Sequence, residues 1–212
     1  KLRKPESDAG DGGGGISNIT TGVVLWTNPF TDVSENDWFY DSVRFVNENG
    51  LFAGVSSKEF APHDTMTRGM LVTVLHRLAG KPQASASKFT DAPAGAWFAD
   101  AVAWASENSI VNGIGNNKFA PNRAITREEM AVIMYNYAKS KGLDVSGKGD
   151  LTKFTDGNKV SAWAADAMSW AISVGLISGR GNGRLDPGGK ATRAENAAII
   201  QRFAAYVGPA AK

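Results

Sequence analysis

Thr126-Arg127-Glu128-Glu129, placed directly before an apolar run, is one of three related strings in this chain of 212 residues. The other two are Thr67-Arg68-Gly69-Met70 and Thr192-Arg193-Ala194-Glu195. A Phe-Thr-Asp run begins 38, 38 and 39 residues before the three arginines, at Phe30, Phe89 and Phe154. Such regular spacing indicates three tandem copies of one supersecondary unit, and this decides the fold before any other feature.

The copies run from 30 to 80, from 89 to 142 and from 154 to 207, and we expect 30–207 to form one structural unit. Residues 1–29 precede them. The polar, glycine-rich stretch 1–15 has the composition of a flexible linker and predicts an upstream domain of the same polypeptide. The apolar stretch 16–29 is either a segment docked on the first copy or the end of a preceding domain.

Within each copy the pattern predicts a helix, a loop and a second helix. A tryptophan, followed three residues later by an aspartate, precedes the first helix, and a glycine and a proline keep the loop out of helical conformation. The second helix begins at the threonine, and its apolar residues have the i, i+3, i+4, i+7 spacing of one buried face. The aligned residues are Trp38, Trp97 and Trp163; Asp41, Asp100 and Asp166; Gly54, Gly113 and Gly179; and Pro62, Pro121 and Pro187.

A pair of short helices cannot bury its apolar face alone, so the three pairs must pack against one another. Either a short solenoid or a closed pseudo-threefold cluster would achieve this. An open solenoid needs polar terminal copies, but the first and last copies here are as apolar as the middle one. We therefore expect an all-α fold that closes around a central bundle.

Composition excludes several classes of function. The net charge is +2, and no long basic run is present, which argues against nucleic-acid binding. The absence of cysteine excludes disulfides, thiolate zinc sites and a cysteine nucleophile. No apolar run approaches the ~20 residues that a membrane-spanning helix needs, so we expect no membrane insertion.

The three threonine-arginine strings have two interpretations. Thr-x-x-Glu before a helix is a capping box, which Glu129 and Glu195 complete and Met70 does not. Capping does not explain the arginine, because a cation in the first turn opposes the helix dipole by about 0.3–1 kcal/mol. An anion held by the guanidinium group and the free first-turn amides would offset this cost. The alternative is an ion pair with an aspartate of a neighbouring copy, such as Asp41, Asp100 or Asp166.

The aligned glycines and tryptophans are also open to two interpretations. Each glycine allows close approach by a ligand or forms a simple left-handed turn. Each tryptophan offers a flat apolar face to a sugar ring or packs in the core, and we expect core packing for at least part of each ring.

Together these motifs resemble the S-layer homology (SLH) domain family, and the likeness covers nearly all of 30–207. The family pattern is Phe-x-Asp, an aromatic residue, a first helix, a glycine, Phe-x-Pro and the Thr-Arg-Ala-Glu string, usually in three copies, and the three copies here follow it with Leu185 in place of the third phenylalanine. The resemblance implies a three-pronged spindle with one helix of each copy in a central three-helix bundle. It also implies an exported bacterial protein, located at the cell wall or S-layer. This protein would be anchored non-covalently through a pyruvylated N-acetylmannosamine of a secondary cell-wall polysaccharide, which lies in grooves between the copies.

The resemblance also assigns roles to individual residues. The residues expected to bind the carboxylate of the ligand are Arg68, Arg127 and Arg193. The residues expected to lie under the sugar ring are Gly54, Gly113 and Gly179. The candidate ligand-binding residues further include Thr67, Thr126, Thr192, Trp38, Trp97 and Trp163. Gly69-Met70 departs from the family pattern, which makes the groove of the first copy the weakest candidate. We expect Arg127→Ala or Arg193→Ala to weaken polymer binding and to leave the fold intact.

Two other functions are weighed against anchoring. A glycan hydrolase needs two carboxylates about 5–10 Å apart in one cleft, whereas every polar feature here appears three times. We therefore expect no enzyme, no catalytic residue, no metal and no cofactor; the two histidines, His63 and His76, are expected at the surface. A protein–protein or self-association module of the cell surface is the other alternative.

Overall fold

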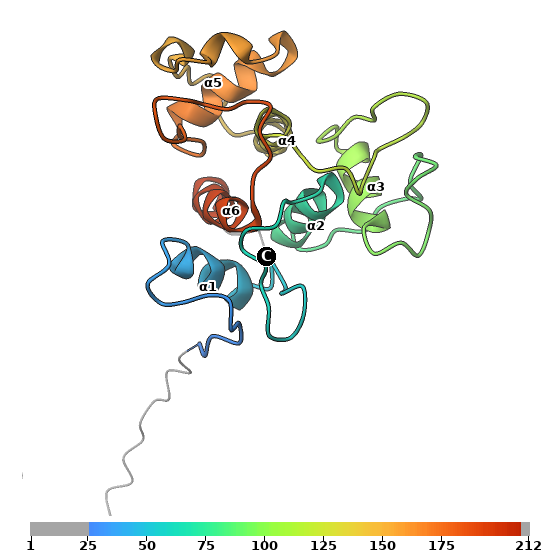
Figure 1. Cartoon of the computed structure of the whole chain (residues 1–212). Helices are drawn as coiled ribbons and strands as arrows, with labels where there is room; N and C mark the ends of the chain where they lie inside the picture. Colours follow the sequence, from blue (N-terminus) through green and yellow to red (C-terminus); the bar gives the residue numbers. More distant parts are fainter. Residues whose placement is uncertain (1–25, 209–212) are drawn as a thin grey trace, which may run out of the picture.

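The computed structural model describes residues 26–208, and these form a helical spindle with three prongs (Figure 1). Three helices lie at its centre: α2 (Arg68–Leu78), α4 (Arg127–Ser140) and α6 (Arg193–Val207). The outer helices are α1 (Tyr40–Glu48), α3 (Ala99–Glu107) and α5 (Ala165–Ser173). Three short 3-10 turns, η1 (Leu151–Lys153), η2 (Gly157–Lys159) and η3 (Ala162–Ala164), precede α5. Within 26–208 the only β-type pairings are isolated bridges, so the all-α expectation is confirmed.

Each prong combines helices from two different copies. Helix α3 packs against α2, α5 packs against α4, and α1 packs against α6 (Figure 1). The first helix of a copy therefore contacts the second helix of the copy before it, and the α1–α6 contact joins the first copy to the last. This interleaving closes the three copies into one ring.

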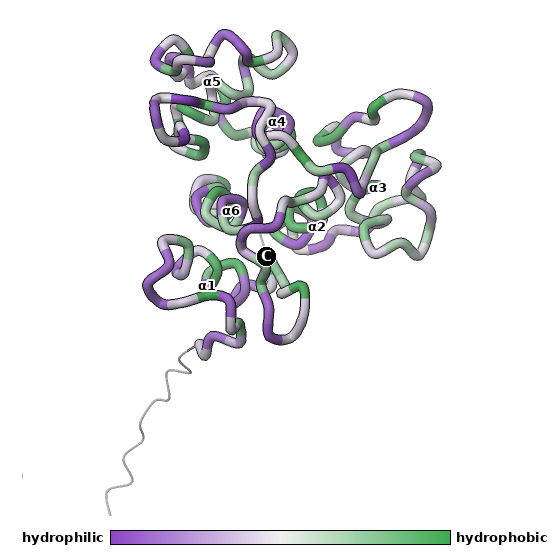
Figure 2. Tube along the Cα trace, viewed as in Figure 1, coloured by the Kyte–Doolittle hydropathy of each residue, from purple (hydrophilic) through white to green (hydrophobic). Residues whose placement is uncertain are grey.

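The core lies where the central helices meet. Leu71 and Leu75 of α2, Met134 of α4 and Ile200 of α6 are fully buried. Burying one such side chain stabilises a fold by about 1.5–3 kcal/mol. Figure 2 shows hydrophobic stretches in the helices and hydrophilic stretches in the loops of the prongs. The apolar face predicted for the second helix of each copy is thus the face that forms the central bundle.

Each Phe-Thr-Asp run fixes the loop of its own copy. The carboxylate of Asp32 accepts hydrogen bonds from the backbone amides of Phe60, at 2.8 Å, and Ala61, at 2.7 Å. These two bonds hold Ala61 in the left-handed region, with φ 55°. The other copies repeat the arrangement with Asp91, Phe119 and Ala120, and with Asp156, Leu185 and Asp186.

These hydrogen bonds also affect the acidity of the carboxylates. Burial by itself would raise the pKa of Asp91, but the amides of Phe119 and Ala120 outweigh burial and lower that pKa. The amide of Leu185 is the main cause that lowers the pKa of Asp156. Both loops are therefore held by ionised carboxylates at neutral pH.

The described end of the N-terminal segment docks on α1. The indole Nε1 of Trp26 donates to Asn47 Oδ1 at 3.0 Å, and the Trp26 ring meets Tyr40 edge-on at 5.7 Å. The predicted linker and the rest of the apolar stretch, residues 1–25, lie outside the described residues. No helix within 26–208 is both long enough and apolar enough to cross a bilayer.

Candidate functional site

The threonines of the three strings cap the central helices. The hydroxyl oxygen of Thr126 accepts from the Glu129 amide at 3.2 Å, and the Glu129 carboxylate accepts from the Thr126 amide at 3.0 Å. Thr192 and Glu195 form the same capping box. Thr67 accepts from the Met70 amide at 3.3 Å without a reciprocal bond. The capping interpretation is confirmed in all three copies.

The first-turn amides of the central helices are already occupied by protein carbonyls. In α2, the Arg68 amide donates to Arg123 O at 3.0 Å and the Gly69 amide donates to Pro121 O at 2.8 Å. In α4, the first two amides donate to Gly189 O and Pro187 O. In α6, they donate to Asp64 O and Pro62 O. The expectation of free amides at these helix starts is therefore wrong, because the proline loop of the next copy covers them.

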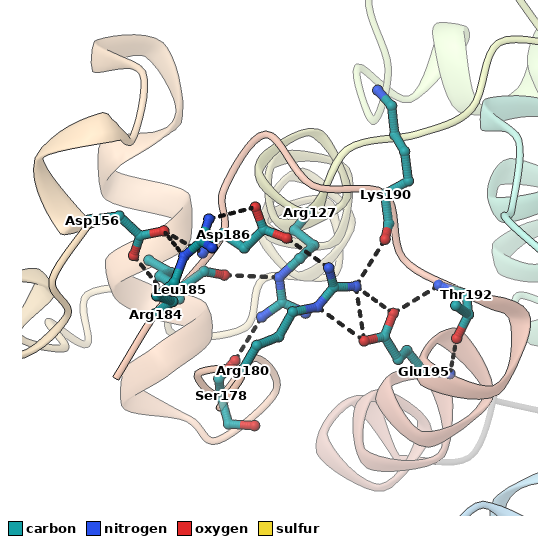
Figure 3. Close-up of polar contacts among 10 residues, drawn as sticks. All are labelled: Arg127, Asp156, Ser178, Arg180, Arg184, Leu185, Asp186, Lys190, Thr192 and Glu195. Atoms are coloured by element: carbon teal, nitrogen blue, oxygen red, sulfur yellow. Dashed lines mark hydrogen bonds and ion pairs between the residues drawn. The ribbon is translucent and has the colours of Figure 1, made fainter. Parts of the chain in front are cut away.

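The three arginines are buried and donate to that same loop. Arg127 donates from Nε to Leu185 O at 3.0 Å and from Nη2 to Ser178 O at 2.6 Å (Figure 3). The counterparts are Arg68 with the carbonyls of Phe119 and Asn112, and Arg193 with the carbonyls of Phe60 and Ala53. Carbonyl oxygens of this loop therefore help to offset the unfavourable helix dipole, and among the described residues none of the three arginines forms an ion pair with Asp41, Asp100 or Asp166.

Burial gives these arginines a structural role. Arg68 and Arg193 also lie over the rings of Phe119 and Phe60, each with the guanidinium carbon 4.7 Å from the ring centre. Burial lowers the pKa of Arg127, although an arginine remains charged at any physiological pH. Truncation would leave two loop carbonyls without their donors, so the expectation that Arg127→Ala or Arg193→Ala leaves the fold intact does not hold.

The aligned glycines are required because loop carbonyls and the phenylalanines of the Phe-Thr-Asp runs pack directly against them. A Cβ atom on Gly54 would lie 2.6 Å from Phe30 Cε1, and one on Gly113 would lie 2.7 Å from Phe89 Cε1. At Gly179 the corresponding distance to Phe154 Cε1 is 2.9 Å. The left-handed turn interpretation is wrong, because none of the three glycines has a positive φ.

The aligned tryptophans are exposed. Trp38, Trp97 and Trp163 are 67%, 60% and 61% exposed, so the expected packing covers only the smaller part of each side chain. The next residue takes the core position in each copy: Phe39, Phe98 and Ala164 are buried, and the Trp97 ring meets Phe98 edge-on at 5.0 Å. Trp104 and Trp170 on the outer helices are the buried indoles. His76 is also buried, contrary to expectation, whereas His63 is exposed.

Three grooves bring together one arginine, one glycine and one tryptophan, each from a different copy. The α2 groove, of about 170 Å³, contains Arg193, Gly54 and Trp97. The α4 groove, of about 210 Å³, contains Arg68, Gly113 and Trp163. The α6 groove, of about 280 Å³, contains Arg127, Gly179 and Trp38. The three capping threonines do not line these grooves.

Sequence analysis missed a further polar residue in each groove, ten positions after the threonine. Arg77 in α2 donates to Leu51 O at 2.8 Å, Asn136 in α4 to Ile110 O at 3.2 Å, and Arg202 in α6 to Leu176 O at 3.2 Å. All three line their grooves. Their fixed distance from the threonine was the signal that could have identified them.

The grooves differ in charge. The α2 groove contains two arginines, Arg77 and Arg193, and no carboxylate. In the α4 groove Glu129 forms ion pairs with Arg123 and, at 3.7 Å, with Arg68. Burial alone would raise the pKa of Glu129, but the Thr126 amide and Arg123 lower it. Glu129 is therefore a carboxylate anion at neutral pH, and it gives the α4 groove a negative charge that the α2 groove lacks.

The α6 groove combines several charges of both signs. Arg180 pairs with Glu195 at 2.6 Å and with Asp186 at 2.6 Å (Figure 3). Arg127 lies behind this network, and Arg202 is exposed at the edge of the groove. Most of the carboxylate charge in this groove is thus matched internally, and Arg202 retains its positive charge for a ligand.

Comparison with known proteins gives a consistent result. The family model of the S-layer homology domain matches residues 29–69, 88–131 and 153–197. An amylopullulanase of Thermoanaerobacterium thermosulfurigenes is 33% identical over 81% of this chain, and the surface-layer 125 kDa protein of Lysinibacillus sphaericus is 29% identical over 82%. The S-layer protein of Bacillus thuringiensis subsp. finitimus is 26% identical over 88%.

The matched region is a small part of these relatives. The chain spans 9%, 14% and 22% of the length of the three proteins, respectively. The similarity to an enzyme such as the amylopullulanase therefore concerns only this region and carries no activity over to the chain. The chain belongs to the S-layer homology domain family, and it is a cell-surface module that associates with the bacterial cell wall and serves in anchoring.

Proposed function

We propose that the chain anchors its polypeptide by binding a pyruvylated, anionic secondary cell-wall polysaccharide in the three grooves, without catalysis. One observation carries the proposal: an exposed indole, a glycine and an arginine from three different copies converge in each groove. No single copy contains a groove of this kind, so binding requires the closed ring.

The exposed tryptophans supply the apolar part of the site. An indole that is 60–67% exposed in the folded chain has apolar surface that a ligand can cover. A sugar ring presents a face of C–H groups that can lie flat on such an indole. The glycine opposite contributes only backbone to the groove wall, because its missing Cβ would point into the loop and the phenylalanine of its own copy.

The arginines supply the charge. The buried Arg127 and Arg193 use Nε and Nη2 for loop carbonyls, and within 26–208 their Nη1 groups donate to no protein acceptor. Arg77 and Arg202 are more accessible and lie at the same grooves. A ketal carboxylate would therefore meet two guanidinium groups in the α2 groove, a strong form of charge-assisted hydrogen bonding.

These charges give a ranking of the grooves for an anion, whereas the sequence singled out only the groove of the first copy as the weakest candidate. The α2 groove lacks the carboxylate because Met70 stands at that position, so it is the best site for an anion. The α4 groove holds Glu129 and has Asn136 in place of the arginine, so it is the poorest. Several sites on one rigid body then raise the overall avidity for a long polymer above that of any single groove.

The test is a triple variant, Trp38→Ala with Trp97→Ala and Trp163→Ala, measured by isothermal titration with purified pyruvylated wall polymer. We expect at least a hundredfold loss of affinity with an unchanged circular dichroism spectrum, because the three side chains are exposed. Val55→Ala is the matched control, since Val55 is an exposed apolar residue outside the α2 groove. Undiminished binding by the triple variant would refute the proposal.

A second measurement separates anchoring from a protein–protein role. Chemical removal of the pyruvate from the polymer should abolish most of the binding by the wild-type chain. If the depyruvylated polymer bound equally well, recognition of the anion would be excluded.

A further inference from the structure

A second cavity adjoins the α2 groove. It has a volume of about 350 Å³ and lies between α2, residues 81–84 and the start of α3. Thr73, Arg77 and Trp97 line both the cavity and the groove. The exposed Trp97 indole therefore borders both hollows, which adjoin each other at these three residues.

Hydrogen bonds hold the outer wall of this cavity in place. Gly80 and Lys81 both have positive φ, at 82° and 56°, and turn the chain sharply out of α2. His76 Nε2 then donates to Pro82 O at 2.9 Å, and the Ser85 amide donates to Glu107 Oε1 at 2.9 Å. The segment 81–84 is thus fastened to α2 on one side and to α3 on the other, which makes the cavity a preformed feature.

The charges in the cavity favour an anion. Arg77 and Lys81 supply two positive groups and Asp100 supplies one negative group. The corresponding connector between α4 and α5 differs, because Lys148 pairs there with Asp166, the counterpart of Asp100, at 2.6 Å. That connector also bonds to α5 directly, through the Gly149 amide and Ser169 O at 2.9 Å. No ion pair is found for Lys81 in the described part of the chain, so its ammonium group can bind a ligand.

We infer that the α2 groove and this cavity form one extended site that binds two consecutive saccharide units of the anionic polymer, one on each side of Trp97. The first unit lies in the α2 groove, and the negatively charged substituent of the second unit faces Lys81 and Arg77. This inference rests on the proposed function and goes beyond it, because it assigns a second subsite to one groove.

The experiment uses the full chain with Trp38→Ala and Trp163→Ala, which leaves only the α2 groove with its indole. Its affinity is measured by titration calorimetry for polymer fragments with one and with two pyruvylated units. We expect the two-unit fragment to bind at least tenfold more tightly. Adding Lys81→Asn should weaken binding of the two-unit fragment three- to tenfold and leave the one-unit fragment unaffected. Asparagine tolerates the positive φ at this position, so the turn should persist.

Lys58→Asn is the matched control, because it removes the same charge from an exposed lysine of the same copy outside both hollows. Equal affinity for the two fragments would overturn the second subsite and leave groove binding intact. An equal response of both fragments to Lys81→Asn would also overturn it. If the wild-type chain bound neither fragment, the proposed function would fail, and the inference with it.

Discussion

The α2 and α4 grooves have the same framework but different electrostatics, because the α4 groove contains a carboxylate and one arginine fewer. Both contain a buried arginine, a glycine packed on a phenylalanine and an exposed tryptophan. They differ three positions after the threonine, where the α2 groove has Met70 and the α4 groove has Glu129. They differ again ten positions after it, where Arg77 stands opposite Asn136. The repeated residues build the groove, and the residues that do not repeat set its charge.

The contrast separates two kinds of arginine. Arg193 is buried and joins the third copy to the loop of the first, whereas Arg77 is half-buried and belongs to one groove. The guanidinium group that recurs in every copy is the one whose removal threatens the fold. The one that differs between copies has the better access to a ligand.

The largest expected effect is the loss of stability when the buried, recurring arginine is removed. Arg193→Ala should lower the free energy of unfolding by about 2–4 kcal/mol, because two hydrogen bonds from a charged donor to buried carbonyls are lost. Urea denaturation at pH 7 provides the measurement. Arg77→Asn is the control, since Asn136 makes the equivalent backbone hydrogen bond in α4, and it should change stability by less than about 1 kcal/mol.

The next largest effect is on ligand binding, and it concerns the residue ten positions after the capping threonine. Arg77→Asn should lower the affinity of the α2 groove for pyruvylated fragments about tenfold, because one charge-assisted hydrogen bond to the ligand is lost. Asn136→Arg should strengthen the α4 groove by a smaller factor, because Glu129 remains beside it. Titrations on chains that retain only one of the three tryptophans would assign each change to its groove. An Asn136→Arg gain larger than the Arg77→Asn loss would contradict the ranking.

A smaller effect on ligand affinity is expected from the residue three positions after the capping threonine. Met70→Glu should reduce anion binding in the α2 groove about three- to tenfold, because it adds a carboxylate near Arg193 and also completes the capping box. Glu129→Gln should raise binding in the α4 groove, since glutamine keeps an acceptor for the Thr126 amide and removes the charge. If Met70→Glu left affinity unchanged while the helix gained stability, charge at this position would be irrelevant to the ligand.

The smallest effect concerns pH. The pKa of Glu129 in the fold is lower than its ordinary value, so its contribution to stability is complete above the ordinary pKa. That contribution is lost as the pH falls through the lowered value. Wild-type chain should therefore lose more stability than Glu129→Gln between pH 7 and strongly acidic pH, in denaturation curves recorded at both. Parallel losses in the two chains would mean that Glu129 is not held by Arg123 and the Thr126 amide.

The repeat pattern predicted most of the fold. The apolar spacing after each threonine defined the central helices, and the apolar end copies predicted closure, which the α1–α6 contact confirms. The spacing could not predict that each outer helix packs on the preceding copy, because that choice depends on the length and path of the loops in space. The capping boxes were predicted correctly, since a cap is a local interaction between residues three apart.

The candidate site was predicted in its members and less well in their roles. The glycines and tryptophans line the grooves and their role as ligand contacts stays a prediction, but the packing of Phe30 on Gly54 and the exposure of Trp97 were not foreseen. The first depends on how the loop folds back onto the start of its own copy, and the second on which of two neighbouring aromatic residues enters the core. Trp97 and Phe98 are equally apolar in sequence, and only the direction in which each projects from the start of α3 distinguishes them.

The sequence by itself determined the three copies, their helices, their caps and the family, because these depend on residue types at fixed spacing along the chain. Only the tertiary structure decided that the recurring arginines serve the loop of the next copy. It also decided that each groove is assembled from three copies and that the first copy has the least acidic groove. The physical reason is distance: an arginine and the carbonyls it binds are 44 to 140 residues apart in sequence, and only closure of the ring brings them together.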